Sequence, residues 1–210
     1  MEFCPAILAK TESEFREKAD RVHPLGLTFH VDVMDGKFVA QTCWADPMVV
    51  PEIADGRPFE VHLMVRDPEH VAAVWLAAGA RRVWVHAEST DRELMIMRSD
   101  PKNADRIGLA LNPETPISRI TPVIDSVSSV MVMGVTPGSS GQAFQEITLE
   151  KIAILKELRP NLWIKVDGGV NKENIARIAA AGADAVAAAT ALTDAPDPKE
   201  ALDGLRKALT

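Results

Sequence analysis

Two imidazoles and two carboxylates follow three apolar runs of this chain, and together they could hold a divalent metal. The run LTFHVD ends with His30 and Asp32, FEVH ends with His62, and LWIKVD ends with Asp167. Each run is predicted to be a β-strand that ends at these residues, and because strand side chains alternate between two faces, His30 and Asp32 share one face. Mixed imidazole and carboxylate ligands suit Zn, Fe, Mn or Co. The four residues therefore predict a site for one divalent metal, with Asp32 and Asp167 as candidate bases.

Two glycine-containing turns could bind the phosphate of a small substrate. The segment VTPGSSGQAF contains a flexible turn with exposed N–H groups and two hydroxyls, formed by Gly138, Ser139, Ser140 and Gly141. Such a turn can hold a phosphate, although an ordinary strand-to-helix turn explains the same residues equally well. The segment DGGVN places Gly168 and Gly169 directly after Asp167 and before a helix, whose N-terminus favours an anion.

Two further groups of residues lie near the ends of predicted strands. His86 and Glu88 follow the fourth strand, where they either line the same cavity or form a buried hydrogen-bonded pair, and we do not assign them to the metal. Three methionines, Met34, Met64 and Met133, either fill the core or provide apolar walls that keep water away from an enolate. Both interpretations stay open for each group.

Alternating apolar runs and helical patterns must position these residues. The predicted strands are Glu2–Leu8, Leu27–Asp32, Pro58–Met64, Arg82–His86, Ile107–Leu111, Ser126–Val132, Leu162–Asp167 and Ala185–Ala188. Helical patterns lie between them: Thr11 and Glu14 are typical of a capping box, and the last helix is predicted over Pro198–Leu209. Eight strands and eight helices predict an α/β fold, a (β/α)8 TIM barrel, as a single catalytic domain over residues 1–210. A doubly wound open sheet is the rival, but catalytic groups at several strand ends favour the barrel.

Composition narrows the classes of protein that the chain can belong to. It has 210 residues, 47% of them hydrophobic, and a formal net charge of −7, which argues against a nucleic-acid or anionic-membrane surface. Cys4 and Cys43 lie on separate elements, which fits a reducing, cytoplasmic location better than a disulfide scaffold. The N-terminus has no signal-peptide pattern, and no apolar run reaches the roughly 20 residues of a membrane span.

Five motifs, taken in order along nearly the whole chain, resemble the ribulose-phosphate 3-epimerase family: HVDVMDGKFV, EVHLMV, GLALNPET, VMVMGVTPGSSGQAF and VDGGVN. The resemblance implies a (β/α)8 barrel that binds one divalent metal through His30, Asp32, His62 and Asp167, with Asp32 and Asp167 as the acid/base pair. It also implies a homo-oligomer, either a dimer or a hexamer, that acts in the pentose phosphate pathway of carbohydrate metabolism. The substrate-binding residues that it implies are His62, Met34, Met64, Met133, Gly138, Ser139, Ser140, Gly141, Gly168, Gly169, Ala189 and Thr190.

Three segments of the chain depart from the family's pattern. Ala6 stands where the family usually has a serine that contacts the substrate, Ala40 and Gln41 alter the turn DGKFVAQ, and Ala189 alters the last phosphate-binding turn. The metal ligands and both bases are intact, so the expected reaction is epimerisation at C3 of D-ribulose 5-phosphate to D-xylulose 5-phosphate. The alternatives are an epimerase of a hexulose 6-phosphate such as allulose 6-phosphate, a decarboxylase of a 3-keto-gulonate phosphate, and a paralogue that only binds a sugar phosphate. The segment HLMVRD lacks the acidic-lysine motif of the decarboxylase.

Overall fold

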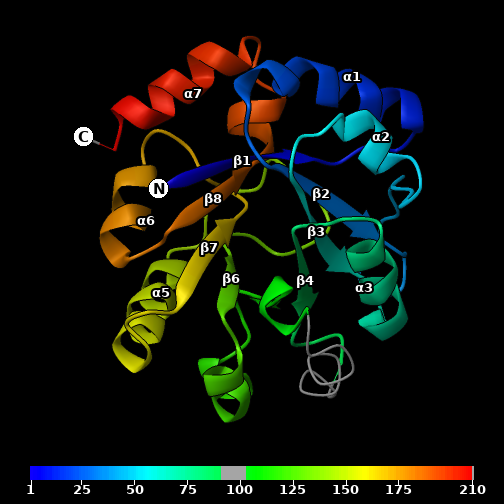
Figure 1. Ribbon diagram of the computed structural model, residues 1–210. Coiled ribbons are helices and arrows are strands. Elements are labelled where there is room, and N and C mark those ends of the chain that lie inside the picture. The colour runs from blue at the N-terminus through cyan, green and yellow to red at the C-terminus, as the bar shows by residue number, and fades with distance from the viewer. Residues whose placement is uncertain (91–102, 210) are drawn as a thin grey trace.

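Eight parallel strands close into a barrel in the computed structural model of this chain, which describes residues 1–90 and 103–209 (Figure 1). Each strand pairs with its neighbours in the sequence, and β8 pairs with β1 to close the ring. The strands are β1 Glu2–Ile7, β2 Phe29–Met34, β3 Phe59–Met64, β4 Arg82–His86, β5 Ile107–Leu111, β6 Ser129–Met133, β7 Trp163–Asp167 and β8 Ala185–Ala188. The predicted TIM barrel is confirmed, and the rival open sheet is wrong.

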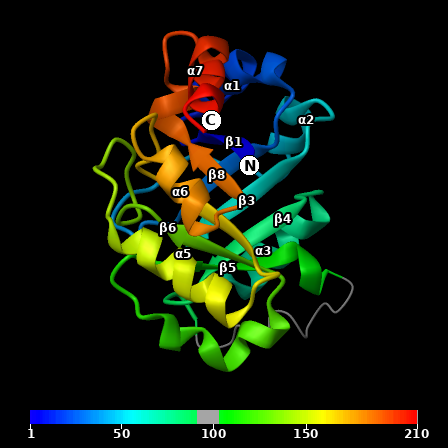
Figure 2. The same cartoon turned by 90° about the vertical axis from the view of Figure 1, so that its left-hand side faces the viewer.

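The α-helices surround this barrel, and Figure 2 shows α5 and α6 side by side on its outer face. Their bounds are α1 Glu12–Val22, α2 Val50–Ala54, α3 Pro68–Ala77, α5 Ile147–Leu158, α6 Ile175–Ala181 and α7 Pro198–Lys207. At the start of α1, the Thr11 hydroxyl accepts the Glu14 N–H at 3.2 Å, as the capping pattern predicts. The Glu14 carboxylate accepts the N–H of Lys10. A full capping box would have it accept the N–H of Thr11, the N-cap residue, so only the hydroxyl half of the box is formed.

Two predictions about the elements are wrong. The second strand extends to Met34 rather than ending at Asp32, so His30 and Asp32 lie within it. The third strand ends at Met64, as predicted, and His62 lies two residues before that end. The segment between β5 and β6 forms 3₁₀ helices at Ile117–Arg119 and Thr121–Ser126 where an α-helix was expected. Prolines in the sequence NPETPISRITPV explain this difference, since proline restricts the preceding residue and removes a backbone donor.

The barrel wall separates two apolar cores. Outward-facing strand residues such as Val31, Val61 and Val166 are fully buried against the surrounding helices and form the larger core. A smaller core lies inside the barrel and contains Trp84, Ala110, Met131 and Met133. Charged and imidazole side chains share this interior, because alternation along the strands turns every second residue inward. The site described below therefore lies above an interior that contains both apolar and charged side chains.

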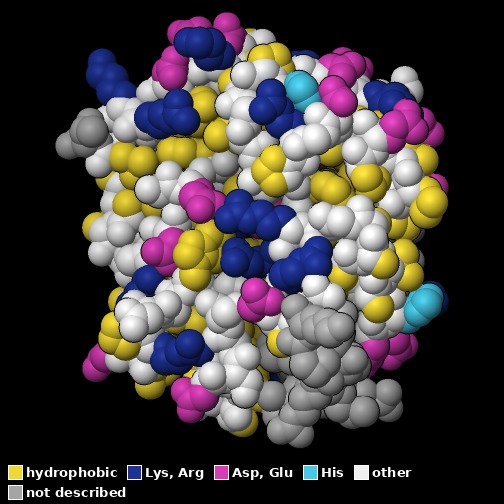
Figure 3. Space-filling view, in the orientation of Figure 1, with side chains coloured by type: hydrophobic (Ala, Val, Ile, Leu, Met, Phe, Trp, Pro, Cys, Tyr) yellow, Lys and Arg dark blue, Asp and Glu magenta, His cyan; other side chains and the backbone are white. Residues whose placement is uncertain are grey.

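The outer surface carries charges of both signs. Figure 3 shows several Lys and Arg side chains close together near the middle of one face, with Asp and Glu side chains around them. The net charge of −7 is thus not spread as a uniformly acidic surface. Within residues 1–90 and 103–209, no helix is long and apolar enough to cross a membrane.

Candidate metal and proton-transfer site

Strand register brings the four predicted metal ligands together. Asp32 of β2 pairs with His62 of β3, and His30 lies two residues before Asp32 on the same inward face. Asp167 ends β7 and completes the group, whose potential ligand atoms all lie within 4.8 Å of one another. The His62 Nδ1 atom is 3.1 Å from Asp32 Oδ1 and 3.2 Å from Asp167 Oδ2. The side chains of Asp32 and Asp167 keep 12% and 11% exposure, so both carboxylates remain accessible to a small molecule.

The unpartnered nitrogen of His30 shows that this group fits a cation. The imidazole is fully buried, and its Nδ1 atom lies 2.6 Å from Glu60 Oε1. Its Nε2 atom has no hydrogen-bond partner, yet it lies 3.6 Å from one oxygen of Asp32 and from one oxygen of Asp167. A buried lone pair beside two carboxylates is unfavourable unless a positive charge lies among them. A divalent cation would satisfy all of these atoms, and the donor set suits Zn, Fe, Mn or Co.

The ionisation of the site shows the same preference for positive charge. Burial lowers the pKa of the His62 imidazole, but the hydrogen bonds that it makes to Asp167 and Asp32 outweigh burial and raise that pKa to about 9. Burial likewise opposes ionisation of Asp167, but His30 and His62 hold its pKa below the usual range. The Asp167 carboxylate therefore stays ionised, and in the absence of a metal the His62 imidazole holds a proton beside it.

His86 and Glu88 form a hydrogen-bonded chain that reaches the His62 imidazole on the side away from the aspartates. The Nε2 atoms of His62 and His86 are 2.8 Å apart, and His86 Nδ1 lies 3.1 Å from Glu88 Oε2. Glu88 also accepts the Asn112 N–H at 2.8 Å; burial opposes its ionisation, but the bond to His86 lowers its pKa to about 2. Of the two interpretations that the sequence left open, the hydrogen-bonded pair is therefore present. It orients His62 so that Nδ1 faces the carboxylates.

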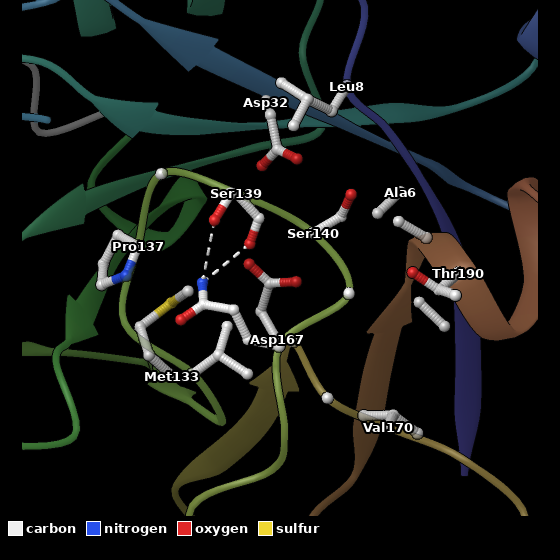
Figure 4. A pocket seen from close by; sticks show the side chains of 18 of the residues that line it. Ala6, Leu8, Asp32, Met133, Pro137, Ser139, Ser140, Asp167, Val170 and Thr190 are labelled. Carbon is white, nitrogen blue, oxygen red and sulfur yellow. Dashed lines mark hydrogen bonds between the residues drawn. The ribbon is translucent and has the colours of Figure 1, made fainter. Parts of the chain in front are cut away.

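A cavity of about 300 Å³ opens above the cluster and collects the remaining predicted residues. Its lining includes Asp32, His62, Asp167 and the predicted substrate-binding residues Met34, Met64, Met133, Gly138, Ser139, Ser140, Gly141, Gly168, Gly169, Ala189 and Thr190. In Figure 4, the carboxylates of Asp32 and Asp167 point into the cavity from different sides. His30 does not line the cavity and reaches the cluster from the buried interior of the barrel.

Several lining residues were not identified from the sequence. Gln142 holds the glycine-serine turn, because its Nε2 atom donates to the carbonyl oxygens of Thr136 at 2.7 Å and Ser139 at 2.9 Å. Leu8 and Asn171 also line the cavity, together with Val135, Pro137, Val170, Ala188 and Ala191. The sequence offered only one indication of their role, which is that each lies one or two residues from a segment already predicted to belong to the site.

A close backbone approach fixes the end of β7, where Asp167 lies. The Gly134 N–H donates to the Asp167 carbonyl at 2.7 Å. A Cβ atom at Gly134 would lie 2.2 Å from the Gly168 carbonyl oxygen, which no side chain can tolerate. Gly168 and Gly169 themselves have φ values of 92° and 70°, a region that favours glycine. The position of the Asp167 carboxylate therefore depends on glycines in two adjacent loops.

The fold and the site together define a class: a (β/α)8-barrel enzyme with paired aspartates and a candidate metal site at the mouth of its barrel. The sequence model described as "Ribulose-phosphate 3 epimerase family" matches residues 2–193. The chain belongs to the ribulose-phosphate 3-epimerase family, and its activity is that of an isomerase, an epimerase.

Individual relatives agree with this assignment. The chain is 36% identical to the chloroplastic ribulose-5-phosphate-3-epimerase of Arabidopsis thaliana over 96% of this chain and 75% of that protein. It is 34% identical to ribulose-phosphate 3-epimerase of Escherichia coli (strain K12), over 98% and 94% of the two chains. A crystal structure of 3-hexulose-6-phosphate synthase shares the fold, with a TM-score of 0.72, 19% identity and full coverage of both chains. At that identity the structural likeness shows the fold alone.

Proposed function

We propose that this chain catalyses metal-dependent epimerisation at C3 between D-ribulose 5-phosphate and D-xylulose 5-phosphate. The observation that carries the proposal is the pair of aspartates, Asp32 and Asp167, which enter one cavity from different sides of a candidate metal site. A carbon next to a ketone is a weak acid, and inversion at that carbon needs a proton acceptor on one face and a proton donor on the other.

In this proposal one aspartate removes the C3 proton and the other supplies a different proton to the opposite face. His30, Asp32, His62 and Asp167 would hold a divalent cation, which would supply Lewis-acid stabilisation of negative charge on the substrate. Asp32 removes the C3 proton from one face, leaving an enediolate, and Asp167 delivers a proton to the opposite face. The roles exchange in the reverse direction. Both carboxylates are held within 3.2 Å of the His62 nitrogen, so the geometry is fixed before the substrate binds.

The rest of the cavity is assigned to binding and protection of the substrate. The turns at Gly138–Gly141 and Gly168–Gly169 and the Ala189–Thr190 turn offer backbone N–H groups and hydroxyls to the phosphate. Met34, Met64 and Met133 form an apolar wall next to the aspartates and keep water from the enediolate. Residues 1–210 act as one catalytic domain, and the dimeric or hexameric state and the cytoplasmic location stay predictions.

A coupled enzymatic assay tests the proposal. We expect the metal-loaded protein to form xylulose 5-phosphate from ribulose 5-phosphate, to lose activity with a chelator, and to regain it when zinc, iron, manganese or cobalt is added. Parallel assays with allulose 6-phosphate and with a 3-keto-gulonate phosphate distinguish the alternatives. Faster turnover of the hexulose phosphate would show that the substrate is a hexulose 6-phosphate. Full turnover in the presence of chelator would show that the reaction does not depend on a metal.

A further inference from the structure

Two charged side chains lie inside the barrel, behind the candidate metal site. Glu60 of β3 and Lys165 of β7 form an ion pair, and their side chains are 4% and 0% exposed. Removing two charges from water is costly, and an apolar pair of similar size often gives an equally stable protein. Stability therefore does not explain why these residues are charged, and their contacts point to another role.

Both charged groups reach the same nitrogen of His30. Glu60 Oε1 lies 2.6 Å from His30 Nδ1, and Lys165 Nζ lies 3.1 Å from that same atom. Their demands are opposite: a carboxylate accepts a hydrogen bond and needs a proton on Nδ1, whereas an ammonium group donates and needs a lone pair there. A neutral imidazole carries its proton on one nitrogen only, so the outcome at Nδ1 decides the state of Nε2.

The state of Nε2 matters because this atom faces the candidate metal site. It lies 3.6 Å from Asp32 and from Asp167 and has no hydrogen-bond partner. If Nδ1 carries the proton, Nε2 keeps a lone pair and can bind a metal. If Lys165 donates to Nδ1 instead, the proton moves to Nε2 and blocks the ligand.

We propose that the Glu60–Lys165 pair positions and selects the metal-binding form of His30, a proposal that rests on the metal site of the proposed function. Glu60 accepts the Nδ1–H of His30 and at the same time engages Lys165, so that the ammonium does not donate to the imidazole. Lys165 in turn supplies the positive charge that pairs with the buried carboxylate. The Cys4 thiol also lies beside Lys165, but a thiol is a weak acceptor and does not replace the carboxylate.

Zinc affinity of four variants tests this arrangement, measured by competition with a chelator of known affinity. Glu60→Met removes the acceptor and releases Lys165, so it should weaken zinc binding most. The double change Glu60→Met/Lys165→Met removes both opposing groups and should restore part of that loss, while remaining about 10–100-fold weaker than the original protein. Glu60→Gln keeps an acceptor oxygen and should retain more affinity than Glu60→Met. Met131→Leu is the matched control, since Met131 pairs with Lys165 inside the barrel and carries no charge.

Nuclear magnetic resonance of the zinc-loaded protein gives a separate readout of the His30 proton. We expect that proton on Nδ1, and a proton on Nε2 would overturn the proposal. Equal zinc affinities of Glu60→Met and the double variant would also overturn it, as would an unchanged affinity of the double variant. If Glu60→Met does not fold, the double variant and Glu60→Gln carry the test. If the unaltered protein binds no zinc, manganese, iron or cobalt, the metal site itself fails, which is a different result.

Discussion

Without a bound metal, the free energy of unfolding of this protein should fall as the pH rises from about 7 to about 8.5. The prediction follows from His62, whose imidazole lies 3.1 Å and 3.2 Å from two carboxylate oxygens. Asp167 and Asp32 outweigh burial and raise its pKa from 6.5 to about 9 in the folded protein. A raised folded pKa gives stability that is complete below the unfolded value of 6.5 and is lost as the pH rises through 9.

The magnitude follows from the difference between the two pKa values. Each pH unit over which only the folded state holds the proton removes about 1.4 kcal/mol of unfolding free energy. Between about pH 7 and about pH 8.5, His62 alone should remove about 2 kcal/mol. The pKa of His30 is also raised, since its carboxylate neighbours outweigh burial and Lys165, and it acts in the same direction. Burial lowers the pKa of His86, so its effect on the unfolding free energy changes mainly at pH values below this range.

Urea unfolding in excess chelator, followed by fluorescence and circular dichroism, measures this slope. With saturating zinc the slope should reverse, because metal binding needs deprotonated ligands and so strengthens as the pH rises. The double variant Asp32→Asn/Asp167→Asn is the control and should show little dependence on pH in chelator. A constant or rising stability of the chelated protein across this range would refute the arrangement of imidazoles and carboxylates described above.

Three further predictions concern activity and folding. Asp32→Asn and Asp167→Asn should each lower kcat by more than the roughly 10²–10⁴-fold typical of general acid/base catalysis, because each change also weakens a metal ligand; near-normal turnover by either variant would contradict the two-base scheme. Ala189 lies in a π-helical turn and is not among the described residues with positive φ. Ala189→Gly should therefore leave substrate binding unchanged, whereas Ala189→Val should raise KM for the sugar phosphate. Unchanged kinetics of Ala189→Val would show that this turn does not bind the phosphate. Gly134→Ala should cost about 1–3 kcal/mol in urea unfolding and should lower kcat, because its Cβ would lie 2.2 Å from the Gly168 carbonyl oxygen and shift Asp167; unchanged kinetics would show that this approach does not hold the carboxylate.

The positions of the ligands could be predicted from the sequence because they depend on local periodicity. His30 and Asp32 share a face since they are two residues apart in a strand, and the structure confirms that they do. The strand ends were less certain, because β2 continues to Met34 through residues whose types do not mark a boundary. Local patterns also missed the 3₁₀ helices between β5 and β6, where prolines override the expected helix.

The residues behind the ligands could not be predicted, because they meet through the closure of the barrel. Alternation alone places Glu60 on the face of His62, and Lys165 on the face of Asp167. That these two side chains meet each other and His30 depends on the register of strands far apart in the sequence. The contact between His62 and His86 depends in the same way on the pairing of β3 with β4. Periodicity identifies the inward face, but it does not identify the partner across it.

Deuterium incorporation at C3 tests the central claim most directly, that two aspartates exchange protons with opposite faces of the substrate. The metal-loaded protein is incubated with D-ribulose 5-phosphate in deuterated water, and the xylulose 5-phosphate formed is analysed by nuclear magnetic resonance. The two-base account predicts that the product carries solvent deuterium at C3, and that Asp167→Asn still binds zinc but forms little of this product. Product that keeps the original hydrogen at C3 would contradict the account, because the proton removed from one face would then have been returned to the substrate instead of being replaced by a solvent-derived proton from the second carboxylate.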